Sequence, residues 1–299
     1  MEVGDAEEML RLLDSSISTM KWKLRSSSKR RLKTDILALC TGLRAVIMVD
    51  YGGKMPELQD HLYDLLRLMR KEFSILIPLK VMVIEDMIYI VHSKGLAEHA
   101  LRSLSLQPQL LFVDVEQDPP KMLLDKENIV VLELLTIQKL ISSTFSADDV
   151  NAESSECKAV DPSSVSEHTA SQPFEIVDLS STVESTQLTL PTLNGWLLGY
   201  PVVYLFRKDN AADSLYNLSV KSLNMYKIIV RRKQIPGRES YDEELMSFTV
   251  PCDLSLRMEK EPWAKAFLSS MLARFERCRQ VWADMRMEAY EFHSQSVVL

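Results

Sequence analysis

The sequence predicts an α+β protein in which helices pack on a mixed or antiparallel sheet. Apolar residues make up 46% of the chain and charged residues 26%, which is ordinary for a globular protein. Helical and strand-like patterns follow one another irregularly, whereas a doubly wound parallel sheet needs them to alternate. Only 8 of the 299 residues are glycine, which leaves few positions for the loops that hold phosphates in nucleotide-binding folds.

The first 145 residues contain most of the regular periodicity. Apolar residues recur every three or four positions, which predicts helices over 5–24, 32–43, 56–73, 96–104 and 129–141. The helix over 56–73 has the most regular spacing, and Pro56 suits its first turn. Strands are expected over 44–50, 79–84, 87–91 and 110–115. The middle two form a hairpin that turns at Glu85 and Asp86.

The last 114 residues give weaker patterns. We expect strands over 187–190, 196–206, 225–231 and 246–250, and a short helix over 215–220. A long C-terminal helix is predicted from Pro262 to Tyr290. Its apolar residues follow steps of four and three: Ala264, Leu268, Met271, Phe275, Cys278, Trp282, Met285 and Ala289. We interpret this spacing as an internal packing face, and a contact with a partner helix or a second copy is the alternative.

An acidic, Ser-rich segment separates these two parts. Residues 146–185 hold nine acidic residues and one base, a net charge of −8, while the whole chain carries −7. Such a composition buries too little apolar surface to offset the entropy of ordering, so we expect a disordered insertion. We therefore predict that 1–145 and 186–299 are two parts of one domain joined by the linker 146–185.

Cysteines and termini suggest a cytoplasmic or nuclear protein. Cys40, Cys157, Cys252 and Cys278 are widely dispersed, unlike the dense cysteines of a secreted disulfide scaffold. The N-terminus is acidic where a signal peptide would be basic. Residues 185–206 carry no charge but contain Pro and Gly, and only 196–206 is continuously apolar. We expect no membrane span, because a spanning helix needs about 20 apolar residues.

Common catalytic signatures are missing from the sequence. It has no GxGxxG, P-loop, HExxH or GxSxG motif, and no CxxC pair. The two closest histidines, His92 and His99, have no third nitrogen or sulfur ligand near them in sequence. We therefore predict no cofactor, no metal site and no catalytic residue of a known type.

One alternative is a metal-independent enzyme that uses carboxylates at strand ends. Asp50, followed by Tyr51, and Asp114 each come after an apolar strand-like run. A simpler interpretation is that such aspartates start turns through hydrogen bonds to the backbone. The enzyme hypothesis requires Asp50, Asp114 and a histidine to meet in one cavity.

A basic run extends over residues 21–33, with seven Lys or Arg residues and no acid. A nuclear-import signal or a contact with phosphates or anionic lipids are the functional interpretations. A solvated joint between two helices is the simpler one. The rest of the folded part is nearly neutral, so the sequence gives no strong nucleic-acid signal.

The acidic segment contains a possible partner-binding motif, Phe174, Ile176, Val177, Asp178 and Leu179. The tetrad 176–179 followed by two serines resembles a SUMO-interacting motif, which adds as an extended strand to a sheet edge. Phe174 and Val177 also fit the aromatic-x-x-aliphatic core of autophagy-adaptor motifs. An ordinary apolar run, or the first strand after the linker, is the simpler interpretation.

Three serines are candidate phosphorylation sites. Ser146, Ser164 and Ser181 each have an acid three residues later, a pattern typical of acidophilic kinases. Phosphate there would increase the negative charge of the segment.

Residues Leu193–Phe206 (LNGWLLGYPVVYLF) and Val49–Gly52 (VDYG) resemble an uncharacterised family of animal proteins known from a chromosome 1 open reading frame. The resemblance covers most of both flanks and omits the acidic segment. Because the family has no known function, it implies no active site, substrate or cofactor.

Taken together, these features predict a non-catalytic intracellular protein that acts through contacts with other proteins. The sequence leaves its oligomeric state open.

Overall fold

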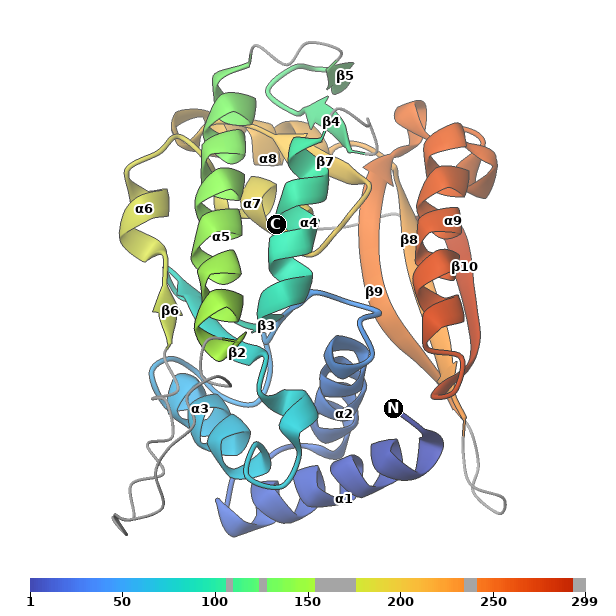
Figure 1. The fold of residues 1–299 in the computed structure, drawn as a ribbon. Coiled ribbons are helices and arrows are strands. Elements are labelled where there is room, and N and C mark those ends of the chain that lie inside the picture. Colours follow the sequence, from blue (N-terminus) through green and yellow to red (C-terminus); the bar gives the residue numbers. More distant parts are fainter. Residues whose placement is uncertain (106–109, 124–127, 154–175, 234–240, 293–299) are drawn as a thin grey trace, which may run out of the picture.

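The computed structural model describes residues 1–105, 110–123, 128–153, 176–233 and 241–292. Within these ranges, helices surround three small sheets, of which two are mixed and one is antiparallel (Figure 1). The α+β fold class is thereby confirmed.

The first sheet has the strand order β1-β3-β2-β6. Its strands are β1 (Val46–Met48), β2 (Leu79–Ile84), β3 (Met87–His92) and β6 (Val177–Asp178). The β2–β3 hairpin is confirmed, and Glu85 in its turn has a φ of 55°. Strand β6 joins the β2 edge in parallel.

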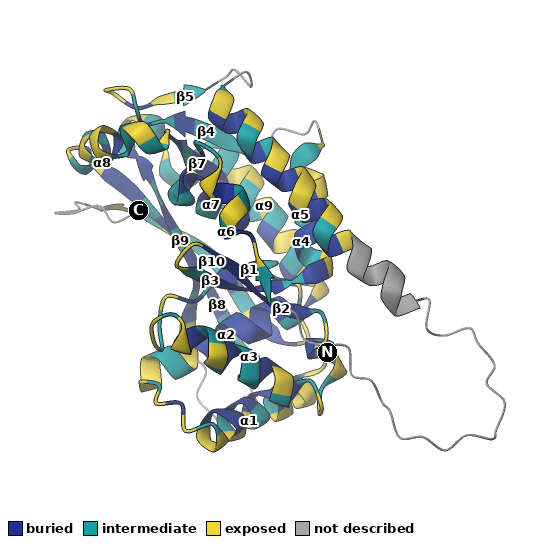
Figure 2. Cartoon of the chain, turned by 90° about the vertical axis from the view of Figure 1, so that its left-hand side faces the viewer, coloured by how far each residue is buried: buried dark blue, intermediate teal, exposed yellow. Residues whose placement is uncertain are grey.

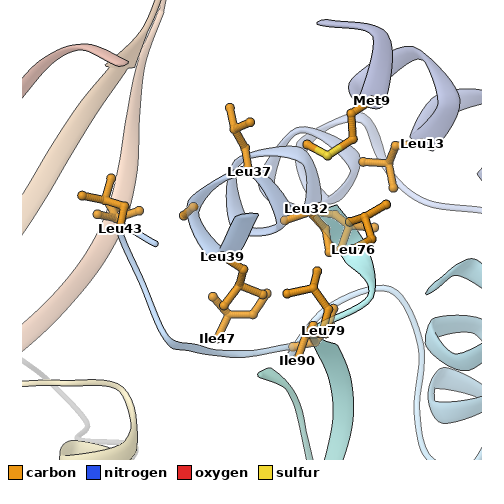
Figure 3. Packing of buried hydrophobic residues seen from close by; sticks show 14 of the residues in the cluster. Met9, Leu13, Leu32, Leu37, Leu39, Leu43, Ile47, Leu76, Leu79 and Ile90 are labelled. Atoms are coloured by element: carbon orange, nitrogen blue, oxygen red, sulfur yellow. The ribbon is translucent and has the colours of Figure 1, made fainter. Parts of the chain in front are cut away.

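Helices cover both faces of this sheet because its strands are apolar on both sides. Val81 and Val83 of β2 pack toward α1 (Val3–Thr19), α2 (Ser26–Cys40) and α3 (Glu57–Met69). Met82 and Ile84, which point the other way, pack toward α4 (Ser93–Leu104) and α5 (Ile129–Glu153). Figure 3 shows Leu32, Leu39, Ile47, Leu79 and Ile90 gathered between α2 and the sheet.

The second sheet has the order β5-β4-β7 and the third the order β10-β8-β9. The elements involved, together with the helices beside them, are β4 (Leu111–Asp114), β5 (Lys121–Leu123), α6 (Ser180–Glu184), α7 (Leu190–Leu197), β7 (Val202–Leu205), α8 (Ala211–Ser219), β8 (Leu223–Arg232), β9 (Asp242–Pro251), α9 (Pro262–Arg277) and β10 (Trp282–Phe292). Short 3₁₀ turns lie at 74–76, 208–210, 252–254 and 258–260.

Buried side chains from distant parts of the sequence form common clusters. The first cluster joins residues of α1, α2 and α3 to Ile228, Trp282 and Met285 of the third sheet. The second joins α4 and α5 to Val183, Trp196 and β7. Figure 2 shows these buried residues in the interior, with exposed residues on the outer helix faces. Both clusters therefore combine residues from before and after the acidic segment.

The predicted C-terminal helix over 262–290 is wrong in its second half. Helix α9 ends at Arg277, and β10 pairs antiparallel with β8 over its full length. Met285, Met287 and Ala289 pack inward, while Arg286 and Glu288 are less buried and form ion pairs or hydrogen bonds. Positions four apart share a face in a strand as well as in a helix, so the apolar spacing fitted both structures.

The predicted strands over 187–190 and 196–201 are also wrong. Residues 190–197 form helix α7, which has Pro191 in its first turn. Gly199, with a φ of 75°, ends the helix in a Schellman motif: its N–H donates to Trp196 O, and that of Tyr200 donates to Gly195 O. Only Val202–Leu205 of the expected run is a strand.

Regular structure is present at both ends of the acidic segment, for which disorder is predicted over 146–185. Helix α5 continues to Glu153, and β6 and α6 occupy 177–184. Leu179 and Val183 are buried, so apolar residues at this end supply enough contact to order the backbone. Residues 154–175 lie outside the described ranges.

Candidate functional site

A cavity of about 330 Å³ lies between α4, α9 and the turn from α7 to β7. Helix α4 contributes His99 and Arg102, and the turn contributes Tyr200. Helix α9 contributes a face of residues three or four apart: Trp263, Phe267, Ser270, Met271 and Arg274. We call this cavity the arginine pocket. Its volume falls in the range of small-molecule sites.

Two guanidinium groups line the arginine pocket, and the described lining residues include no Asp or Glu. In the part of the chain described, Arg274 has no carboxylate within ion-pair distance. Burial lowers the pKa of Arg274 to about 10, and repulsion by Arg102, Arg277 and Arg44 acts in the same direction. Arg274 is therefore still charged at neutral pH.

A third guanidinium group, that of Arg44, is buried beside the arginine pocket. Arg44 is buried and donates to the backbone oxygens of Leu245 (3.0 Å) and Leu198 (3.3 Å). It shares a very small cavity with His99 and Arg274, directly beside the arginine pocket. Asp35 attracts Arg44 and compensates part of its charge, but Arg274 has no carboxylate within ion-pair distance in the described part of the chain. Burial of a cation is costly unless an anion compensates it. The positive charge in this region therefore favours binding of an anion.

Hydrogen bonds fix the wall formed by α4 and α7. His99 Nε2 donates to Trp196 O (2.9 Å), and the two rings are stacked with centroids 5.3 Å apart. Trp196 Nε1 donates to Ser103 Oγ (2.8 Å), which itself donates to His99 O (2.9 Å). The Schellman turn at Gly199 places the Trp196 carbonyl and Tyr200 at this wall.

Part of the pocket lining is aromatic. Tyr200, Trp263 and Phe267 belong to a cluster with Tyr226 and Phe248, in which neighbouring ring centroids lie 5.1–6.3 Å apart. The first three of these rings also line the arginine pocket. The pocket therefore combines cationic groups with flat apolar surfaces.

The buried position of His99 predicts that the folded protein loses stability as the pH falls. Burial lowers its pKa to about 4, aided by repulsion from Arg274 and Arg102 and opposed by the bond to Trp196 O. The unfolded chain binds this proton near pH 6.5, whereas the native chain does not, so stability falls as the pH falls through this window. We expect a loss of about 2 kcal/mol between pH 7 and pH 5 from this group. Urea unfolding at both pH values measures it.

The variant His99→Gln keeps a donor for Trp196 O and removes the titration. It should lose less stability than the native sequence over the same pH interval. Equal losses in both proteins would contradict the assignment to His99.

The predicted strand-end carboxylates do not meet. Asp50 is exposed after β1, whereas Asp114 ends β4 in another sheet. Asp114 accepts hydrogen bonds from Glu116 N (2.9 Å) and Gln117 Nε2 (2.7 Å), as a turn aspartate does. His92 caps α4 by accepting from Gly95 N (3.1 Å). These positions give the enzyme hypothesis no shared cavity.

The partner-binding motif lies at the edge of the first sheet. Ile176 is partly buried and packs against the first cluster, and Val177–Asp178 form β6. Leu179 is buried, and its N–H donates to Val83 O (2.9 Å). Phe174 lies outside the described residues. The motif thus extends its own sheet by parallel strand pairing.

The three candidate phosphorylation sites are separate in space or undescribed. Ser146 is exposed in α5, and Ser181 is exposed in α6. Ser164 lies outside the described ranges.

The basic run joins α1 and α2. Lys29 and Lys33 form ion pairs with Asp14 at 3.1 and 2.7 Å. Arg31 pairs with the buried Asp35 at 3.1 Å. Part of this run therefore has a structural role within the folded chain.

Sequence reasoning did not identify the arginine pocket. Its lining residues come from three segments far apart in the chain, and no local motif connects them. The only available signal was the spacing of Trp263, Phe267 and Arg274, which places two aromatic rings and a cation on one helix face.

Comparison with protein families gives a match to a domain of unknown function, DUF4504, over residues 14–299. The chain belongs to this family. The match covers both flanks, so the DUF4504 domain includes every element that lines the arginine pocket. No curated protein and no solved structure matches the chain.

Two further properties of this DUF4504 chain concern metals and membranes. Among the residues with described positions, no group of three or more His, Cys, Asp or Glu is placed to hold a metal ion. Ile129–Ser146 of α5 is long and apolar enough to cross a membrane by length and composition. Val130, Leu134, Ile137 and Ile141 of this helix are buried in the second cluster, whereas Ile129, Leu132 and Leu140 are exposed.

Proposed function

We propose that this protein is a non-catalytic binding protein that takes an anionic ligand in the arginine pocket. The observation that carries the proposal is Arg274, a largely buried guanidinium without a carboxylate partner in the described part of the chain. Arg102, which lies 3.9 Å from Glu98, adds a second cation, and aromatic rings add apolar walls. Guanidinium groups bind carboxylates and phosphates through paired hydrogen bonds.

Inorganic phosphate is the simplest probe, and quenching of tryptophan fluorescence is a direct readout because Trp196 and Trp263 line the pocket. We expect saturable binding that is weakened about 10- to 100-fold by Arg274→Met, since a hydrogen bond to a charged group is worth about 1.5–3 kcal/mol. Arg277→Met is the matched control: it removes an exposed cation from the same helix outside the pocket.

The same variants test the electrostatic argument without a ligand. Because Arg274 is a buried cation without a described carboxylate partner, Arg274→Met should not lower the melting temperature of the unliganded protein. Absence of phosphate binding, or equal weakening by Arg274→Met and Arg277→Met, would contradict the proposed function.

We also propose a second function, recognition of partner proteins through Phe174, Ile176, Val177, Asp178 and Leu179. The extended pairing of β6 supports it, because the same strand geometry is used in β-augmentation. Leu179 is buried, so a partner would have to displace β6 from β2.

Binding of SUMO to a 174–185 peptide and to the full chain tests this second function. The peptide should bind, and the full chain should bind more weakly because the motif is already paired. Combined Val177→Ala and Leu179→Ala substitutions should abolish peptide binding, whereas Thr182→Ala should not. Unchanged binding after the double substitution would rule the motif out.

We further propose that the protein works in the cytoplasm or nucleus and that its family is the animal family known from a chromosome 1 open reading frame. The described cysteines, Cys40, Cys252 and Cys278, are free thiols, which supports a reducing compartment. The runs Leu193–Phe206 and Val49–Gly52 support the finer family assignment.

A further inference from the structure

We propose that the ligand of the arginine pocket is an aryl phosphate monoester, meaning one aromatic ring system that carries a phosphoryl group. This inference rests on the proposed anion-binding function and specifies its ligand. It follows from the charge, the walls and the volume of the pocket.

Charge favours a phosphoryl group over a carboxylate. Arg102 and Arg274 line the pocket; Arg102 also lies 3.9 Å from Glu98, which does not line it, whereas Arg274 has no carboxylate within ion-pair distance among the described residues. Arg44, whose charge Asp35 compensates in part, shares a small cavity with Arg274. A phosphate monoester carries a charge of about −1.5 to −2 at pH 7, and so offsets more of this positive charge than a monoanion does.

The aromatic residues that line the arginine pocket favour a ligand with an aromatic ring. Trp263, Phe267 and Tyr200 are each partly exposed, although they belong to a packed aromatic cluster. All three residues line the arginine pocket. Flat aromatic surfaces bind aromatic ligands by stacking, which is worth a factor of roughly ten or more in affinity.

The volume limits the ligand to one ring system. An apolar cavity of about 150 Å³ is enough to hold benzene. The arginine pocket, at about 330 Å³, therefore has room for one ring system and a phosphoryl group. A dinucleotide would exceed it.

Titration of the full chain with four probes tests the inference: inorganic phosphate, phenyl phosphate, benzoate and phenol. We expect phenyl phosphate to bind about tenfold tighter than inorganic phosphate, and benzoate and phenol to bind more weakly than phenyl phosphate. Arg274→Met should weaken phenyl phosphate and inorganic phosphate alike.

Phe267→Leu preserves an apolar side chain and removes a ring. It should reduce the ratio of the two affinities, phenyl phosphate over inorganic phosphate, by a factor of about three or more. This ratio is independent of any loss of folded protein, because such a loss affects both ligands equally. Leu272→Ala, at an exposed position of α9, is the matched control and should leave the ratio unchanged.

The outcomes separate this inference from the proposed function. If inorganic phosphate binds in an Arg274-dependent manner but phenyl phosphate binds no tighter, the ring assignment is wrong and anion binding stands. If benzoate binds as tightly as phenyl phosphate, the phosphoryl assignment is wrong. If none of the anions binds, both proposals fail.

Free phosphotyrosine and a phosphotyrosine peptide share this chemistry and represent two sources of the ligand, a small metabolite and a modified protein. Either one binding tighter than inorganic phosphate supports the inference and identifies the source, whereas binding of neither, together with weak phenyl phosphate binding, overturns it.

Discussion

Replacing Asp35 with alanine is expected to lower the free energy of unfolding by about 3–5 kcal/mol. Asp35 is completely buried in α2, and its Oδ2 accepts hydrogen bonds from Arg31 Nε (3.1 Å) and Tyr51 OH (2.8 Å). The attraction of Arg44 also acts on this carboxyl group, although burial raises its pKa. Removal of the carboxylate would leave two largely buried guanidinium groups without compensation.

Urea unfolding followed by circular dichroism measures this loss. Asp50→Ala is the control, because Asp50 is exposed and its loss should change stability by less than about 0.5 kcal/mol. The double variant Asp35→Leu, Arg31→Met should recover part of the loss, since an apolar pair avoids the desolvation of both charges. Similar effects of Asp35→Ala and Asp50→Ala would show that the buried network contributes little.

The second large effect is expected for Trp282→Ala, with a loss of about 3–5 kcal/mol. Trp282 is fully buried at the start of β10 and packs in the first cluster. Its Nε1 donates to Thr41 Oγ1 (3.1 Å) at the end of α2. The substitution removes a large core volume and one of the hydrogen bonds between the third sheet and the end of α2.

Thermal and urea unfolding of three variants separates these contributions. Thr41→Val keeps the core volume of Trp282 and removes the Thr41 hydroxyl, which accepts from Trp282 and donates to Leu37 O (2.8 Å); it should cost about 1 kcal/mol. Tyr290→Ala, at an exposed position of the same strand, should change stability by less than about 0.5 kcal/mol. A small effect of Trp282→Ala would contradict the burial of β10 against α2.

Local sequence determinants predicted the elements whose apolar pattern has only one interpretation. The hairpin of β2 and β3 has two apolar runs around a two-residue turn, and α3 keeps regular helical spacing over 13 residues. Both appear at the predicted positions. Tertiary contacts were not needed to choose between alternatives there.

Ambiguous apolar patterns were resolved by strand pairing in one case and by helix-end residues in another. The apolar positions Trp282, Met285 and Ala289 suit a helix, but β8 offers ten residues of antiparallel pairing and places them in a strand. By composition, residues 187–190 and 196–206 look like strands. Thr189, Pro191 and Gly199 instead provide the start and end of a helix.

The arginine pocket was harder to predict from the sequence than the helices and strands were. Arg102 and Arg274 are 172 positions apart in the sequence, and each one alone resembles an ordinary surface arginine. Only the packing of α4, α7 and α9 gives them a common cavity with no described carboxylate. The absence of Asp and Glu from the described pocket lining depends on which residues the fold brings together. The order of residues along the chain does not show it.

The sequence by itself determined the α+β class, the early helices, the hairpin and the concentration of negative charge in one segment, because these follow from local spacing and composition. The tertiary structure decided where the acidic segment ends, which strand partner the C-terminal residues take, and which cations are buried together. Those features depend on contacts between distant residues, whose free energy exceeds the small differences in local preference between helix and strand.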